Sequence, residues 1–209
     1  ISVGRLSPEK RHEVLLRAWA RLAPSAPGWR LEIHGDGPLR PALARLVEEL
    51  GLADTVALMG VTRDMEAVYR RARLMLHPAE YEGFPMAVGE ALARAVPVVG
   101  FADCTGLNFL VRDGVNGRLA APGRDRAAAL ADAAGALLAD PAGVEALAAA
   151  APGTVAPYTL AAVTDLWEDR LTRLVEGPTA PPTSPAAARA AAPPTPTRGS
   201  PPGTPPPPP

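Results

Sequence analysis

Apolar and polar residues alternate along roughly the first hundred residues in a pattern that predicts short strands, most of them followed by a helix. The apolar segments have the length expected of buried strands and cover residues 1–3, 29–34, 56–59, 74–77 and 97–101. Apolar residues spaced three and four apart predict helices between them, over about 8–22, 38–50, 62–69 and 85–95. Ser7 and Thr62 are expected as N-caps, Pro8 and Pro38 as first helical residues, and Gly51 as a helix stop.

Short, fully apolar strands that alternate with helices are typical of a parallel sheet covered on both faces. Right-handed crossovers make such a sheet doubly wound, so the predicted fold class is α/β and Rossmann-like. Ligands of these sheets bind at the carboxyl ends of the strands. We therefore expect the functional loops to follow Val3, His34, Met59, His77 and Phe101.

The second part of the chain has a different composition. Alanine-rich helices are predicted over 125–138 and 143–150, and an amphipathic helix over 160–175. Residues 178–209 contain 14 of the 26 prolines and too few apolar residues to offset the entropy of ordering. The expected organisation is one domain over 1–177 and a disordered Pro/Ala/Thr-rich tail over 178–209, either solvated or bound by a proline-recognising domain.

Charge and cysteine content narrow the function classes. The net charge of −1 gives no electrostatic basis for binding nucleic acid. The single Cys104 cannot form an internal disulfide, which fits a reducing cytoplasm. We therefore expect a cytoplasmic protein, either free in solution or peripheral at the inner membrane face. No apolar run of the length needed to span a bilayer stands out. The chain starts at Ile1 inside a predicted strand, so we interpret it as a fragment of a longer protein.

The strongest candidate site is the segment from Glu82 to Glu90, which reads EGFPMAVGE. Pro85 fits the first position of a helix, and Gly83 lets a ligand approach the backbone. Amides near Phe84 would then face outward at a helix N-terminus, which favours a phosphate. The two carboxylates beside that anion site are suited to accept hydrogen bonds from the hydroxyls of a sugar and a ribose. Alternatively, Glu82 only complements the helix dipole and Glu90 is solvated.

A second candidate is Gly4-Arg5-Leu6-Ser7-Pro8-Glu9-Lys10, which leaves the first strand and enters a helix. Arg5 and Lys10 would lie over the carboxyl edge of the sheet and could bind a diphosphate together. Of the 21 basic residues, Lys10 is the only lysine. Because Arg and Lys are not interchangeable, that isolated lysine indicates a specific need. An exposed surface pair is the alternative.

Other segments are weaker candidates. Gly35-Asp36-Gly37-Pro38 is explained equally well by a plain turn, and Asp113-Gly114-Val115-Asn116-Gly117 is mainly a turn signal. The loop 102–108, with Thr105 and Gly106, could offer amides to phosphate. Cys104 is expected in the core, and His12, His34 and His77 are expected to be structural, with His77 facing the site.

Several motifs are absent from the sequence. It has no Asp-x-Asp pair, no Walker-type glycine loop and no Gly-x-Gly-x-x-Gly. No metal or other cofactor is therefore expected. Charge that develops on a leaving diphosphate would be met by Arg5, Lys10 and backbone amides.

Taken in order, these motifs resemble the family-4 retaining glycosyltransferases of the GT-B fold, over about residues 1–120. The residues that carry the resemblance are Val3-Gly4-Arg5-Leu6 with Lys10, Gly35–Pro38, Tyr69 with Ala72, Glu82–Pro85 with Glu90-Ala91, Pro97-Val98-Val99 and Asp113–Gly117. The helix near Trp167 is similar to the family's closing helix. The resemblance implies that the chain is the C-terminal, nucleotide-sugar-binding half of such an enzyme.

The resemblance also implies roles for individual residues. Arg5 and Lys10, with Gly4, would bind the diphosphate of a UDP- or GDP-sugar. Glu82 and the backbone of Gly83, Phe84 and Pro85 would bind the transferred sugar, and Glu90 the ribose. The implied reaction is metal-independent transfer with retention, by front-face attack in which a donor phosphate oxygen takes the acceptor's proton.

Two departures limit the resemblance. Asn108 stands where many relatives have a glutamate, which leaves phosphate contacts by Thr105 and Gly106 open. The N-terminal domain that would bind a glycan or lipid-linked acceptor is not part of the chain. Alternatives are a non-catalytic nucleotide-sugar-binding module, a GT-B-fold nucleotide-sugar epimerase, or a doubly wound domain without a ligand.

Overall fold

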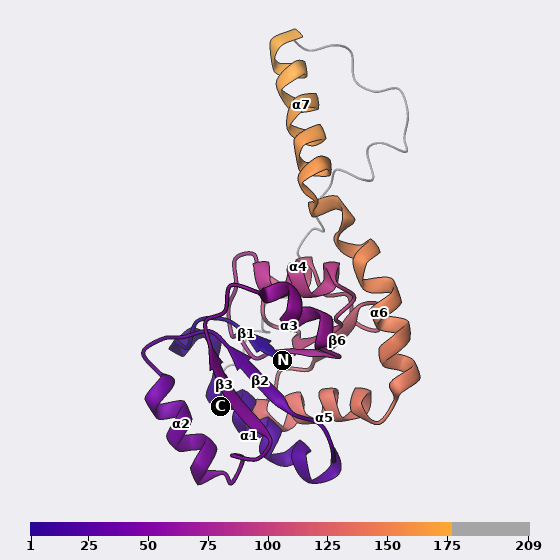
Figure 1. Ribbon diagram of the computed structural model, residues 1–209. Helices are drawn as coiled ribbons and strands as arrows, with labels where there is room; N and C mark the ends of the chain where they lie inside the picture. Colours follow the sequence, from indigo (N-terminus) through magenta and orange to yellow (C-terminus); the bar gives the residue numbers. More distant parts are fainter. Residues whose placement is uncertain (177–209) are drawn as a thin grey trace, which may run out of the picture. The chain divides into compact units, whose positions relative to one another are not determined.

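The computed structural model describes residues 1–176, and its strands are all parallel (Figure 1). Strands β1 (Ser2–Val3), β2 (Leu31–His34) and β3 (Val56–Gly60) form one sheet in the order β1-β2-β3. Strands β4 (Met75–His77), β5 (Val98–Phe101) and β6 (Gly117–Ala120) form a second sheet in the order β4-β5-β6.

Ile1 joins these two sheets edge to edge. Its nitrogen donates to the carbonyl of Leu74, and its carbonyl accepts from the amide of Leu76, each over 2.8 Å. This is the hydrogen-bond pattern of parallel neighbours, so β1 continues onto β4. The combined order is β3-β2-β1-β4-β5-β6, which is the Rossmann order with its topological switch point between β1 and β4. The predicted fold class is therefore confirmed.

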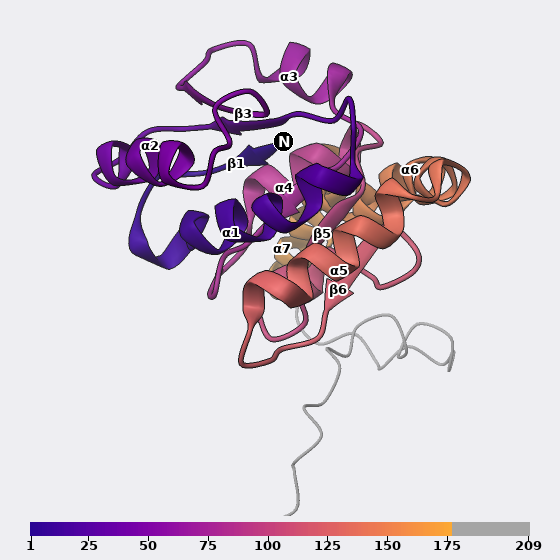
Figure 2. The same ribbon diagram turned by 90° about the horizontal axis from the view of Figure 1, so that it is seen from below.

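Helices cover both faces of this sheet. Helix α1 (His12–Leu22) packs against α2 (Arg40–Glu49) and α5 (Arg126–Leu138), whereas α4 (Met86–Ala93) packs against α6 (Pro141–Val155). Figure 2 shows α3 (Met65–Arg71) on one side of the sheet and α1 on the other. The core lies between these layers, and every residue of β5 is buried, as the apolar sequence of that strand predicts.

Helix starts differ from the sequence prediction in several places. Helix α2 begins at Arg40 with Leu39 as its N-cap, so Pro38 lies before the helix and is not its first residue. After Ser7, a 3₁₀ turn over Pro8–Lys10 precedes α1, because Arg11 takes the left-handed conformation at φ 52° and interrupts the helix. Asp64, not Thr62, caps α3: its carboxylate accepts from the amide of Ala67, while the Thr62 hydroxyl accepts from the amide of Asp64. Asp64 is the N-cap because its side chain reaches a free amide of the first turn.

Strand β6 was not predicted. Its sequence, Gly-Arg-Leu-Ala, has neither β-branched residues nor strict alternation, and it pairs with β5 over its whole length. Gly117 is required there, because a Cβ would lie 2.0 Å from the carbonyl oxygen of Val98. Helix α6 is also longer than expected and contains Pro152.

The chain divides into two units, Ile1–Val163 and Thr164 onward. Helix α7 (Leu160–Glu176) is present as predicted, with its amphipathic sequence. The tail predicted over 178–209 lies outside the described residues, and the domain boundary at 177 stays a prediction.

By length and composition alone, the helical stretch Pro141–Glu176 could cross a membrane. This is weak support for a span, because α6 buries Val144, Leu147, Ala151 and Val155 in the core.

Asn116 ties the loop before β6 to α6. It is fully buried, accepts from the amide of Arg112, and donates to the carbonyl of Leu110 and the hydroxyl of Thr154, each over 2.7 Å. The Asp113–Gly117 segment is thus a turn, as predicted, whose asparagine satisfies buried backbone groups.

Replacing Asn116 with alanine leaves those partners unsatisfied in the core. We expect Asn116→Ala to lower the free energy of unfolding by about 2–3 kcal/mol, measured by urea denaturation. Asn108→Ala is the matched control, since the exposed Asn108 makes one hydrogen bond, to the carbonyl of Ala102 over 2.8 Å. It should cost less than about 1 kcal/mol. Equal losses in the two variants would contradict the assigned role of Asn116.

Candidate functional site at the switch point between β1 and β4

The loop after β1 is fixed against the loop after β2. The amide of Gly4 donates to His34, and that of Leu6 donates to Asp36, each over 2.9 Å. A Cβ on Gly35 would lie 1.9 Å from the carbonyl oxygen of Gly4, and one on Gly37 would lie 2.4 Å from that of Leu6. The two glycines therefore serve close backbone packing, which favours the turn interpretation of this motif.

Lys10 ends the 3₁₀ turn, and its side chain extends back over Gly4. An ideal Cβ on Gly4 would be 3.8 Å from Cδ of Lys10, so the aliphatic stem lies close to this glycine. The ammonium group donates to Oε1 of Glu82, forming an ion pair between side chains that are 23% and 12% exposed. Arg5 is exposed and makes no side-chain hydrogen bond or ion pair within residues 1–176.

Glu82 follows β4 and is held by two partners. Nε2 of His77 lies 3.1 Å from the same Oε1, although the buried nitrogen makes no well-aligned hydrogen bond. Burial alone would raise the pKa of this carboxyl, but the contacts from His77 and Lys10 outweigh burial and lower it to about 2. Glu82 is therefore ionised at neutral pH.

The segment from Gly83 to Ala87 leads from this carboxylate into α4. Within the described residues, the amides of Phe84, Met86 and Ala87 donate no hydrogen bond. Pro85 is buried and precedes the first helical residue, one position earlier than predicted. The ring of Phe84 packs edge-on against Tyr158, with centroids 5.3 Å apart. These contacts leave the amides at the start of α4 available to an anion.

Glu90 lies on α4 and accepts a hydrogen bond from the hydroxyl of Tyr69 over 3.0 Å. Arg94 lies over the Tyr69 ring at 5.4 Å and pairs with Glu66. Burial and the nearby Glu90 carboxylate raise the pKa of Tyr69, so its hydroxyl is a permanent donor. The sequence did not indicate this contact.

The loop after β5 packs onto the backbone of Glu82. A Cβ on Gly106 would lie 2.2 Å from the carbonyl oxygen of Glu82, so only glycine permits this approach. Thr105 is exposed beside it. Burial raises the pKa of the Cys104 thiol, which fits the predicted core role.

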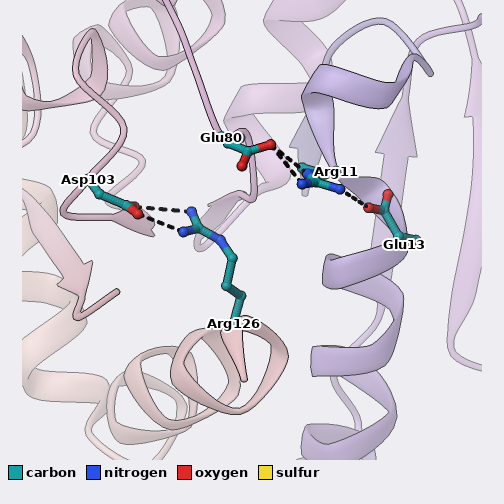
Figure 3. A network of polar contacts seen from close by, with 5 residues as sticks. All are labelled: Arg11, Glu13, Glu80, Asp103 and Arg126. Atoms are coloured by element: carbon teal, nitrogen blue, oxygen red, sulfur yellow. Dashed lines mark hydrogen bonds and ion pairs between the residues drawn. The ribbon is translucent and has the colours of Figure 1, made fainter. Parts of the chain in front are cut away.

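Ion pairs fix the loops on both flanks (Figure 3). Arg11 bonds the carboxylate of Glu80 over 2.8 Å and also contacts Glu13, which ties the β4–α4 loop to α1. Arg126 on α5 makes two bonds to Asp103, of 2.7 and 3.1 Å, and lies over the ring of Phe101. Two strand-end loops are thereby anchored to helices.

The sequence matches a known family. The family model described as glycosyl transferases group 1 matches residues 1–140. The chain belongs to this family.

Curated proteins of similar sequence are longer than this chain. An exopolysaccharide phosphotransferase of Streptomyces coelicolor is 34% identical over 82% of this chain and 18% of its own length. The alpha-D-kanosaminyltransferase of Streptomyces kanamyceticus is 34% identical over 78% of this chain and 42% of its own. The D-inositol 3-phosphate glycosyltransferase of Nocardia farcinica is 39% identical over 66% of this chain and 32% of its own. The chain thus spans less than half the length of these relatives.

Several solved structures have the same fold as this chain. The pneumococcal O-GlcNAc transferase GtfA, in complex with UDP and GlcNAc, superposes with a TM-score of 0.77 at 21% identity, over 84% of this chain and 35% of that one. Anabaena HepE, in complex with UDP-glucose, superposes with a TM-score of 0.71 at 24% identity, over 82% of this chain and 48% of that one. The Rossmann-like layer is therefore that of GT-B glycosyltransferases.

The structure brings the main predicted site residues to one edge of the sheet. Gly4, Lys10, Glu82 and Gly106 are connected by direct contacts, and Gly83 follows Glu82 directly. Arg5 is in the same loop but is directed at no described partner. Within residues 1–176, no group of three or more His, Cys, Asp and Glu side chains is placed to hold a metal ion.

His12 is buried next to the candidate site, near His77 and Lys10. Burial, followed by the nearby His77 and Lys10, lowers its pKa to about 4. As the pH falls from 6.5 towards 4, the unfolded chain binds a proton at this position that the folded chain does not bind. The folded state therefore loses stability in that window.

We expect His12→Gln to remove most of this pH dependence. The wild-type free energy of unfolding should fall by up to about 3 kcal/mol between pH 6.5 and 4 through this group alone. The variant should show a flatter profile over the same range in urea titrations. An unchanged slope would contradict the assignment of a buried neutral histidine.

Proposed function

We propose that the chain is the C-terminal, donor-binding half of a glycosyltransferase of hexosyltransferase type. The reaction would transfer a sugar from a nucleoside diphosphate sugar with retention and without a metal. The observation that carries the proposal is the meeting of Lys10 and Glu82, 72 positions apart, at the switch point of a doubly wound sheet. A cation and an ionised carboxylate at this position suit the two chemically different parts of such a donor, the diphosphate and the sugar.

The diphosphate would bind at the cationic side of this site. Lys10 supplies a compact positive charge, and the exposed Arg5 in the same loop supplies a fork for phosphate oxygens. The free amides at Phe84, Met86 and Ala87 add the positive end of the α4 dipole. Thr105 and Gly106 complete the rim on the β5 side.

The sugar and the ribose would bind at the carboxylates. The Glu82 carboxylate, whose pKa is lowered to about 2, can accept hydrogen bonds from sugar hydroxyls across the physiological pH range. The backbone of Gly83 and Phe84, with Pro85, lines the same position. Glu90 has one oxygen bound by Tyr69, so ribose hydroxyls can use its remaining acceptor positions.

In the proposed reaction the enzyme supplies charge stabilisation and alignment. Negative charge on the leaving diphosphate is met by Lys10, Arg5 and the amides of the 83–87 segment. A donor phosphate oxygen accepts the acceptor's proton, so no side chain of this chain needs to act as a nucleophile. The acceptor, a glycan or lipid-linked sugar, would be held by an N-terminal domain in the full-length cytoplasmic enzyme, free or at the inner membrane face.

The names of the relatives support this class of reaction. Two are glycosyltransferases, and structural neighbours carry UDP or UDP-glucose. A third is named an exopolysaccharide phosphotransferase, which supports the polysaccharide context but not sugar transfer itself. We therefore propose UDP as the first nucleotide to test and GDP as the second. A role in building extracellular polysaccharide is part of the same proposal.

Calorimetric titration of the chain with UDP and with GDP tests the donor site. We expect one nucleotide to bind equally well with and without EDTA, and Lys10→Ala to weaken binding about tenfold or more, since it removes a charge-assisted phosphate contact. Arg17→Ala is the control, because Arg17 is an exposed cation on α1 outside the site. It should bind like wild type.

Circular dichroism would establish that each variant is folded. Absence of binding of both nucleotides by a folded wild-type chain would overturn the donor-site proposal. Binding that vanishes with EDTA would overturn its metal-independent part.

A further inference from the structure

The ion pair between Lys10 and Glu82 conflicts with simultaneous use of both groups by a donor. Its two side chains are largely buried, at 23% and 12% exposure, and each is the ion-pair partner of the other. A diphosphate at Lys10 would place further negative charge beside the Glu82 carboxylate. The negative charges of the diphosphate and the Glu82 carboxylate would repel each other in this partly desolvated site. An ammonium has three N–H donors and can contact both groups, but the added negative charge weakens the contact between Glu82 and Lys10 and favours its exchange for the diphosphate.

His77 offers Glu82 another partner. It is 3% exposed at the end of β4, so the core fixes its position. Its Nε2 is buried, lies 3.1 Å from Oε1 of Glu82 and makes no well-aligned hydrogen bond within residues 1–176. A buried polar nitrogen without a satisfied bond is costly, so a small rotation of the carboxylate towards it would be favourable.

We propose that Glu82 neutralises Lys10 until a donor diphosphate displaces it, and that His77 is the positioning residue that retains Glu82 after this exchange. The inference rests on the proposed function and adds regulation of the same site. An anion that occupies Lys10 alone must compete with Glu82. A complete sugar nucleotide also gives the displaced carboxylate its sugar hydroxyls, so the exchange favours donor over the nucleoside diphosphate product.

Removing the competing carboxylate should strengthen binding of a nucleoside diphosphate. We expect Glu82→Gln to bind UDP, or GDP if wild type selects it, at least about threefold more tightly than wild type in calorimetry. Glu49→Gln is the charge-matched control. Glu49 is exposed at the C-terminal end of α2 and makes no side-chain hydrogen bond or ion pair within residues 1–176. Its variant should stay within about twofold of wild type.

The role of His77 can be separated from a structural one by a double-mutant cycle. His77→Leu should weaken nucleotide binding at least about threefold where Glu82 is present, because the displaced carboxylate then has no partner. The same substitution in the Glu82→Gln background should change binding less than about twofold. His77→Gln, which keeps an N–H donor near Nε2, should restore most of the affinity.

The outcomes distinguish this inference from the proposed function. Wild-type binding that depends on Lys10, with equal or weaker binding by Glu82→Gln, would overturn the exchange and leave the donor site standing. Equal loss on His77→Leu in both backgrounds would assign His77 a structural role and overturn its positioning role. No nucleotide binding by any of these folded proteins would overturn the proposed function and the exchange together.

Discussion

Two backbone hydrogen bonds from Ile1 to Leu74 and Leu76 hold the halves of the sheet together at the switch point. Through them, the loop that leaves β1 and the loop that leaves β4 emerge side by side at the same edge. The ion pair between Lys10 and Glu82 depends on this adjacency. Lys10 reaches Glu82, and Gly106 closes on the Glu82 backbone, because three strand ends are in register there. The helices on the flanks then fix the loops through Arg11 and Arg126.

Most of the layer architecture could be predicted, because it depends on local patterns. Five of the six strands and the main helices follow from apolar spacing, and β5 shows this most clearly, with four buried residues in a row. Strand β6 could not be found in this way, because its pairing with β5 is decided by backbone packing at Gly117 rather than by side-chain pattern. The break at Arg11 is likewise tertiary: a non-glycine residue with φ 52° gives no local signal and is retained by its pair with Glu80.

For the site, the sequence indicated residue types and loops but not partners. Lys10 and Glu82 were candidates for opposite ends of one ligand, and the structure adds that they form an ion pair with each other. His77 was expected to face the site but not to share an oxygen with Lys10, because that depends on carboxylate orientation. The contact between Tyr69 and Glu90 joins two helices and has no sequence signature. Chemistry at strand ends is thus predictable by location, whereas hydrogen-bond pairing requires the three-dimensional arrangement.

The isolation of Lys10 has a practical consequence. It carries the only side-chain amine among 209 residues, and that amine is engaged by a carboxylate at the centre of the candidate site. A reagent that modifies lysine amines can therefore mark just one side chain, and its rate of reaction reports how often the amine is released. Covalent labelling followed by peptide mass measurement would therefore report the occupancy of the site through this residue, without the introduction of a probe.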